Sequence, residues 1–90
     1  MKDLPNHAQI VDVRTPGEFQ EGHFPGAINI PVDQLQKRIG ELKKEQPVVA
    51  YCQSGNRSGM AISFLKGQGF DAMNGGGLVD MLQLKNQDHV

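Results

Sequence analysis

The sequence predicts an α/β fold with a small parallel sheet of four or five strands flanked by helices. Short runs rich in β-branched residues alternate along the chain with segments whose apolar residues recur at helical spacing. The strongest run, Val48–Tyr51, is apolar at every position, as expected of a strand that is buried on both faces. Strands that alternate with helices form parallel sheets through right-handed crossovers.

The first predicted strand and helix follow a short polar lead-in. Ile10–Val13 is the strand, because most of its residues are β-branched. Thr15 then caps a brief helix, with Pro16 at its first position and Glu18 reaching back in a capping box. We expect Gly22 to end this helix.

A second strand and a longer helix come next. Ala27–Ile30 is the predicted strand, and Pro31 closes it. An amphipathic helix is predicted over residues 32–44, because apolar side chains recur there at helical spacing between polar ones. These apolar residues are Leu35, Ile39 and Leu42.

The second half of the chain repeats the alternation around one cysteine. The Val48–Tyr51 strand is followed by Cys52, a polar loop and a helix over residues 60–65. Residues 70–73 form the fourth predicted strand. A flexible, glycine-rich turn over residues 74–77 then leads into a terminal helix.

The composition describes one small domain, residues 1–90, with a core over 9–84 and loose ends at 1–8 and 85–90. The chain is 38% hydrophobic and 21% charged, with a net charge of -1. This balance gives no reason to expect nucleic acid or a membrane surface as a partner. No apolar stretch approaches the ~20 residues of a membrane span, and residues 1–9 lack the apolar centre of a secretory signal.

Cys52, the only cysteine, is the centre of the predicted site. One cysteine forms no internal disulfide, which fits a reducing compartment, so we expect a cytoplasmic protein with a free thiol. Where a strand end leads into a helix, backbone N–H groups and the helix dipole favour an anion or a thiolate. We therefore expect an exposed, reactive thiol with a lowered pKa rather than a buried cysteine that acts as a small hydrophobe.

Arg57 is the only charged residue between Gln46 and Leu65, so the sequence predicts a positive field around Cys52 with no opposing carboxylate. Arg57 has two possible roles, which are holding an anionic substrate and bracing the loop. No metal site and no cofactor are predicted, because the histidines are scattered and lack the spacing of metal ligands. The histidines are His7, His23 and His89.

Three motifs give the chain a resemblance to a known family. The first is Asp12–Phe19 with the segment 21–31 that follows it, the second is Cys52-x4-Arg57, and the third is Gly75–Leu78. In this order they resemble the signatures of the rhodanese sulfurtransferases. That family usually has a strand and a helix before the first motif, so we expect the sheet to lack them. The resulting open edge would be covered by a dimer or by a neighbouring domain.

The resemblance implies that Cys52 is catalytic. It would attack the outer sulfur of a small anionic donor such as thiosulfate, become a persulfide, and pass the sulfur to cyanide, a thiol or a partner protein. The resemblance also implies a substrate-binding loop and nearby supporting residues, in a monomer or weak dimer. The loop residues are Gln53, Ser54, Gly55, Asn56, Arg57 and Ser58, and the supporting residues are Asp12, Arg14 and His23.

The supporting residues have structural interpretations. We expect Asp12 and Arg14 to form a structural pair at a strand end, and His23 to brace a loop by hydrogen bonding. The loop side chains of Gln53, Ser54 and Asn56 are uncharged. Turnover with thiosulfate is therefore expected to be slow, and a protein-bound persulfide is the favoured donor.

Two other functions remain open. Rhodanese-like phosphatases of the Cdc25 type, and similar arsenate reductases, use Cys-x5-Arg, where the extra residue widens the loop for a tetrahedral anion. Only four residues separate Cys52 from Arg57, which favours sulfur transfer. The second alternative is a non-catalytic docking or regulatory module of the same fold, and the intact cysteine motif argues against it.

Overall fold

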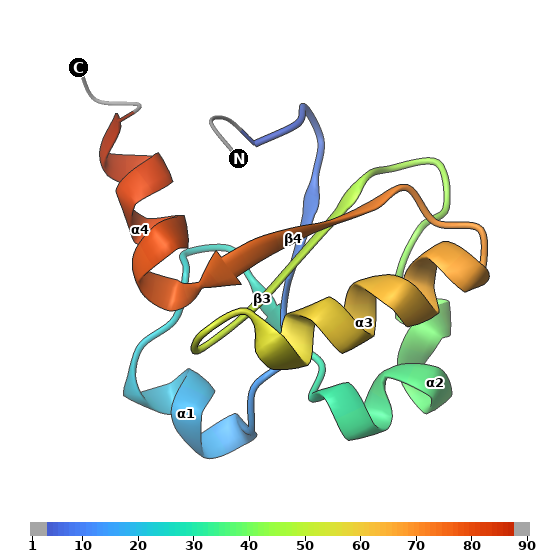
Figure 1. Ribbon diagram of the computed structural model, residues 1–90, viewed down its shortest axis with the longest axis horizontal. Helices are drawn as coiled ribbons and strands as arrows, with labels where there is room; N and C mark the ends of the chain where they lie inside the picture. The colour runs from blue at the N-terminus through green and yellow to red at the C-terminus, as the bar shows by residue number, and fades with distance from the viewer. Residues whose placement is uncertain (1–3, 88–90) are drawn as a thin grey trace.

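The computed structural model of the chain describes residues 4–87. Its centre is a parallel sheet of four strands in the order β2-β1-β3-β4 (Figure 1). This architecture confirms the predicted parallel α/β sheet. The strands are β1 (Gln9–Asp12), β2 (Ile28–Asn29), β3 (Val48–Cys52) and β4 (Ala72–Gly77).

Helical segments connect the strands. The α1 capping box of Thr15 and Glu18 is present, and Gly22 follows the last helical residue, so both predictions for this helix are confirmed. The α-helices are α1 (Pro16–Glu21), α2 (Leu35–Arg38), α3 (Asn56–Gly67) and α4 (Leu78–Gln87), and the 3₁₀ turns are η1 (Val32–Gln34) and η2 (Ile39–Glu41). None of the helices within residues 4–87 is long and apolar enough to cross a membrane.

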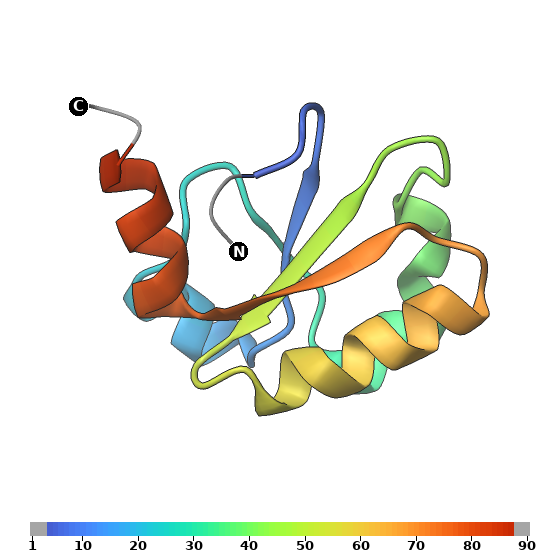
Figure 2. The ribbon, with the colours of Figure 1, turned by 45° about the horizontal axis from the view of Figure 1, so that its top comes forward.

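The two faces of the sheet bury different side chains because neighbouring residues of a strand point to opposite sides. From β3, Val48, Ala50 and Cys52 join the cluster packed by α2 and α3. Val49 and Tyr51 join the opposite cluster, which includes residues of α4. Figure 2 shows α2 and α3 together on one side of the sheet and α4 on the other. Cys52 therefore points toward the start of α3.

The prediction of one helix over residues 32–44 is wrong. The segment consists of η1, α2 and η2, and it ends in an extended conformation at Leu42. Gly40 favours this break, because glycine in a helix interior costs about 1 kcal/mol relative to alanine. Leu35 and Leu42 are nevertheless buried, so the apolar spacing correctly located the inner face of the segment.

Helix α3 begins at Asn56, four residues before the predicted start. Gly55 precedes it with a φ of 99°, a left-handed conformation that glycine adopts without strain. The chain therefore reverses within Gln53–Gly55, and Asn56, Arg57 and Ser58 form the first turn of the helix rather than part of a loop.

The glycine-rich segment is a strand and not the predicted flexible turn, because Gly75, Gly76 and Gly77 all belong to β4. A side chain at Gly77 would overlap the carbonyl oxygen of Gln53, and one at Gly75 would overlap Met81. Glycine is needed here for the close approach of neighbouring segments.

The ends of the chain are partly described. Helix α4 continues to Gln87, beyond the predicted core limit at residue 84, while residues 1–3 and 88–90 of the predicted loose ends lie outside the described residues. Within residues 4–87, β4 has β3 as its only strand neighbour. Its outer edge is thus open in the part of the chain that the structure describes.

Candidate active site

Cys52 is the last residue of β3, and its side chain is only 1% exposed. The prediction of an exposed thiol is therefore wrong. The cause is the tight reversal at Gln53–Gly55, which brings the first turn of α3 against the sulfur. Polar groups of this turn nevertheless face the sulfur, so Cys52 is not in a purely apolar environment.

The Cys52 sulfur is surrounded by hydrogen-bond donors. The backbone N–H of Gly55 lies 3.0 Å from Sγ, and the Ser58 hydroxyl lies 3.5 Å from it. Burial raises the pKa of the thiol, but the Ser58 hydroxyl and the N–H groups of Ser58, Ser54 and Gly55 outweigh it and lower the pKa to about 7. A lowered pKa is what the sequence predicts, and it provides a nucleophilic thiolate near neutral pH.

Asn74 holds this arrangement from the neighbouring strand. Its side-chain oxygen accepts the Gly76 N–H at 2.9 Å and lies 2.7 Å from the Ser58 hydroxyl, so Asn74 and the Cys52 sulfur share the single Ser58 proton. Its amide nitrogen donates to the Gly55 carbonyl at 3.1 Å. Asn74 thus connects β4 to both groups that contact the cysteine. Sequence reasoning missed Asn74, because nothing near residue 74 in the sequence indicates that it contacts Gly55 and the start of α3.

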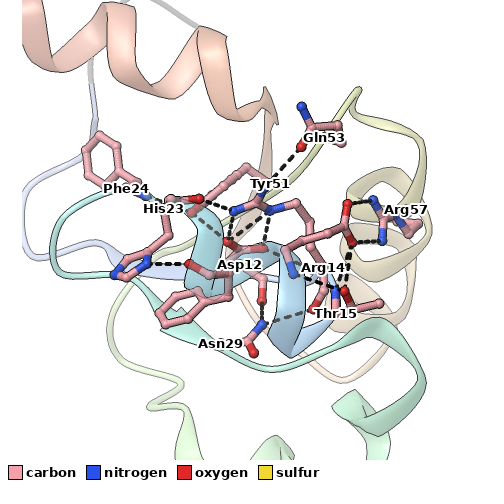
Figure 3. Close-up of polar contacts among 12 residues, drawn as sticks. Asp12, Arg14, Thr15, His23, Phe24, Asn29, Tyr51, Gln53 and Arg57 are labelled. Carbon is pink, nitrogen blue, oxygen red and sulfur yellow. Dashed lines mark hydrogen bonds and ion pairs between the residues drawn. The ribbon is translucent and has the colours of Figure 1, made fainter.

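Asp12 and Arg14 form a buried ion pair, shown in Figure 3, which confirms the predicted structural pair. Arg14 Nη2 lies 2.7 Å from Asp12 Oδ2, and the two side chains are 3% and 0% exposed. Arg14 also donates to the Gly22 carbonyl at 2.7 Å and to the Gln53 side-chain oxygen at 3.0 Å. The pair therefore connects the end of β1 to the reversal that follows Cys52.

Tyr51 completes this buried network, and it is a residue that the sequence analysis did not select. Its hydroxyl donates to Asp12 at 2.8 Å and accepts the backbone N–H of Phe24 at 2.9 Å (Figure 3). Burial, together with the neighbouring Asp12 carboxylate, raises the pKa of Tyr51 to about 12. The phenol therefore stays protonated and serves as a structural donor.

Arg57 is not the free cation that the sequence predicts. Its two terminal nitrogens lie 2.7 and 3.0 Å from the two carboxylate oxygens of Glu18. The prediction that no carboxylate opposes the positive field is therefore wrong. It failed because Glu18 is 39 positions away in the chain and reaches Arg57 only in the folded protein.

The remaining predicted site residues are exposed. Gln53, Ser54 and Asn56 are exposed around the reversal. His23 is also exposed, stacks on the Phe19 ring with 3.6 Å between centroids, and places Nδ1 2.8 Å from the Phe19 carbonyl oxygen. This contact agrees with the predicted bracing role, and within residues 4–87 no hydrogen bond joins His23 to the Cys52 region.

Comparison with known proteins identifies the family. A sequence model of the rhodanese-like domain matches residues 1–79. The chain belongs to the rhodanese-like domain family.

Among the described residues, no group of three histidine, cysteine, aspartate or glutamate side chains is placed to hold a metal ion.

Curated relatives and solved structures of this rhodanese-like domain agree with the assignment. The thiosulfate sulfurtransferase PspE of Escherichia coli is 38% identical over 78 residues, which cover 83% of this chain and 75% of PspE. The uncharacterized protein YqhL of Bacillus subtilis is 48% identical over 62 residues, covering 69% of this chain. The chain spans 49% of the length of YqhL.

The structural neighbours include a rhodanese with anions from E. coli. It superposes with a TM-score of 0.76 at 38% identity, covering 81% of this chain and 89% of the other. A rhodanese-related protein from Thermoplasma volcanium gives a TM-score of 0.78 at 29% identity, covering 86% of this chain and 78% of the other. The rhodanese fold is thus shown by both comparisons.

The environment of Cys52 predicts a pH dependence for thiol alkylation by iodoacetamide. The rate should rise with pH to half its maximum at about pH 7, rather than at the ordinary thiol pKa of 9.0. Because the folded pKa lies below the unfolded one, the ionised thiol stabilises the fold fully above about pH 9. This stabilisation is lost as the pH falls through about 7.

Ser58→Ala should move this midpoint upward, since the Ser58 side chain is the largest of the groups that lower the thiol pKa. Ser63→Ala, an exposed serine of the same helix, is the matched control and should leave the midpoint unchanged. A wild-type midpoint near 9, or equal shifts in the two variants, would contradict the described environment.

Proposed function

We propose that this rhodanese-like domain is a sulfurtransferase that carries sulfur as a persulfide on Cys52. The observation that carries the proposal is a thiol with a lowered pKa at the end of β3, facing the N–H of Gly55 and the hydroxyl of Ser58. Relatives named thiosulfate sulfurtransferases, at 38% and 40% identity, support this choice.

In the first half-reaction the Cys52 thiolate attacks the outer sulfur of thiosulfate. The bond between the two sulfurs of the donor breaks, and sulfite leaves with the bonding electron pair. The product is a Cys52 persulfide with its negative charge on the terminal sulfur. N–H groups of the Gln53–Gly55 reversal and the first turn of α3 are placed to stabilise this charge.

In the second half-reaction a thiolate or cyanide attacks the terminal sulfur. The persulfide bond breaks, the acceptor keeps the sulfur, and Cys52 leaves as the thiolate that began the cycle. No proton or further electron donor is needed, and no side chain has to act as a general base. This agrees with the position of His23, which contacts Phe19 and not the cysteine.

Slow turnover with thiosulfate, and a persulfide on a thiol or partner protein as the better donor, are part of the proposal. Cys52 is only 1% exposed, which restricts the access of a free donor to its sulfur. A reducing, cytoplasmic environment suits both the single cysteine and a thiol acceptor. We further propose a monomer or weak dimer, with the open edge of β4 as the place of contact.

The test measures two reactions of the same preparation. Thiocyanate formation from thiosulfate and cyanide should be detected, and hydrolysis of p-nitrophenyl phosphate should not. Phosphate release without thiocyanate would instead support the phosphatase alternative. The absence of both reactions, with a persulfide donor also tried, would support the docking alternative.

A further inference from the structure

The ion pair between Glu18 and Arg57 is placed to control which donors reach Cys52. Arg57 lies in the first turn of α3, whose Ser58 hydroxyl contacts the cysteine sulfur. The Glu18 hydrogen bond is the largest cause that raises the pKa of Arg57, and the charge of Cys52 raises it as well, so the guanidinium lies within electrostatic range of the sulfur. Both terminal nitrogens of Arg57 donate to the two carboxylate oxygens of Glu18 in a bidentate ion pair. The cation and the carboxylate cancel each other's charge at this position.

Glu18 is held in place independently of Arg57. The backbone N–H and the hydroxyl of Thr15 lie 3.1 and 3.2 Å from Glu18 Oε1, within the capping box that begins α1. The hydrogen bond from Arg57, followed by that from Thr15, lowers the pKa of Glu18 to about 2. The carboxylate is therefore ionised throughout the range in which the protein works, and its side chain is already ordered toward Arg57.

Arg14, a second cation near the end of β1, is also neutralised. Arg14 donates to both oxygens of Asp12, and its remaining contacts are the Gly22 carbonyl and the Gln53 side chain. Asp80 adds a further carboxylate, which accepts the N–H of Gly77 at 2.8 Å next to the Gln53 carbonyl. The approach to Cys52 thus lacks the excess positive charge that would concentrate a dianion.

Building on the proposed sulfur transfer, we infer that Glu18 determines donor specificity: by neutralising Arg57 it disfavours dianionic donors and favours donors with one negative charge. Thiosulfate carries two charges, whereas a persulfide group carries one. Glu18 is therefore a positioning residue that acts through Arg57 and does not itself touch the reacting sulfur.

Glu18→Gln removes the charge while keeping the capping box, because glutamine also serves at this position. The probes are thiosulfate and the methanethiosulfonate anion, which is similar in size and also has an outer sulfur, but carries one charge fewer. Freeing Arg57 should lower the KM for thiosulfate about tenfold and that for methanethiosulfonate about threefold, since the attraction scales with donor charge. The kcat values should change less than about twofold.

Matched variants separate this effect from a structural one. Glu21→Gln removes an exposed carboxylate from the same helix and should leave both KM values unchanged. In the double variant Glu18→Gln/Arg57→Gln the gain should disappear. Glu18→Ala provides a second neutral replacement, and the salt dependence of kcat/KM for thiosulfate should become steeper in Glu18→Gln than in the wild type.

The outcomes distinguish this inference from the function on which it rests. If the wild type transfers sulfur but Glu18→Gln keeps the wild-type KM for thiosulfate, the inference alone is overturned. Equal changes for the two donors, or a gain that persists without Arg57, would overturn it as well. If no variant transfers sulfur from either donor, the proposed function fails and the inference fails with it.

Discussion

Cys52→Ser is expected to lower thiocyanate formation from thiosulfate and cyanide by at least about a thousandfold, down to the uncatalysed rate. A serine hydroxyl is protonated at neutral pH and cannot form a persulfide, so both half-reactions are lost. The measurement is the initial rate of thiocyanate formation at saturating donor. The replacement is nearly isosteric, so the contacts with Gly55 and Ser58 retain donors and acceptors of similar size.

Ser63→Ala again provides the control, because it alters an exposed serine further along α3 than Ser58. It should keep the wild-type rate. The melting temperature of Cys52→Ser should be close to that of the wild type. The rate would then be lost because the nucleophile is absent and not because the fold is damaged. Sulfur transfer that persists in a folded Cys52→Ser variant would be incompatible with the proposed nucleophile.

Arg14→Met is expected to lower the free energy of unfolding by about 3–5 kcal/mol, more than any other substitution proposed for this protein. Asp12 is 0% exposed, and without the Arg14 side chain its carboxylate would remain buried with the Tyr51 hydroxyl and one backbone N–H but no cation. A loss of this size is a large part of the total stability of a small domain. Urea unfolding followed by circular dichroism measures it.

Arg38→Met is the matched control for this prediction. Arg38 pairs with Glu41 at 2.7 Å, but the two side chains are 35% and 49% exposed. An exposed pair of this kind contributes little, so the variant should lose much less stability than Arg14→Met. Similar losses in the two arginine variants would show that the buried network does not stabilise the fold in the way described.

The local signals of the sequence located most of the fold. The Val48–Tyr51 run, the Thr15 capping box and Gly22 each act within a few residues, and the structure confirms all three. The glycine run misled the prediction. Flexibility is what glycine usually indicates, whereas here the absence of a side chain allows β4 to approach Gln53 and Met81.

The site was harder to predict because its contacts join distant parts of the chain. The junction between a strand end and a helix start indicated the lowered pKa of Cys52, and the short separation of Asp12 and Arg14 at a strand end indicated their pair. By contrast, Glu18 meets Arg57 across 39 positions and Asn74 meets Ser58 across 16. No periodicity or spacing in the sequence records such contacts. The sequence therefore predicted an unopposed positive charge beside Cys52, whereas the carboxylate of Glu18 neutralises it.

The most direct test of the central claim is intact-protein mass spectrometry after incubation with thiosulfate. The wild type should gain one sulfur, about 32 Da, and a thiol reductant should remove it. Cys52→Ala should gain nothing under the same conditions. No gain in the wild type with any sulfur donor, or an equal gain in Cys52→Ala, would contradict the assignment of Cys52 as the sulfur carrier.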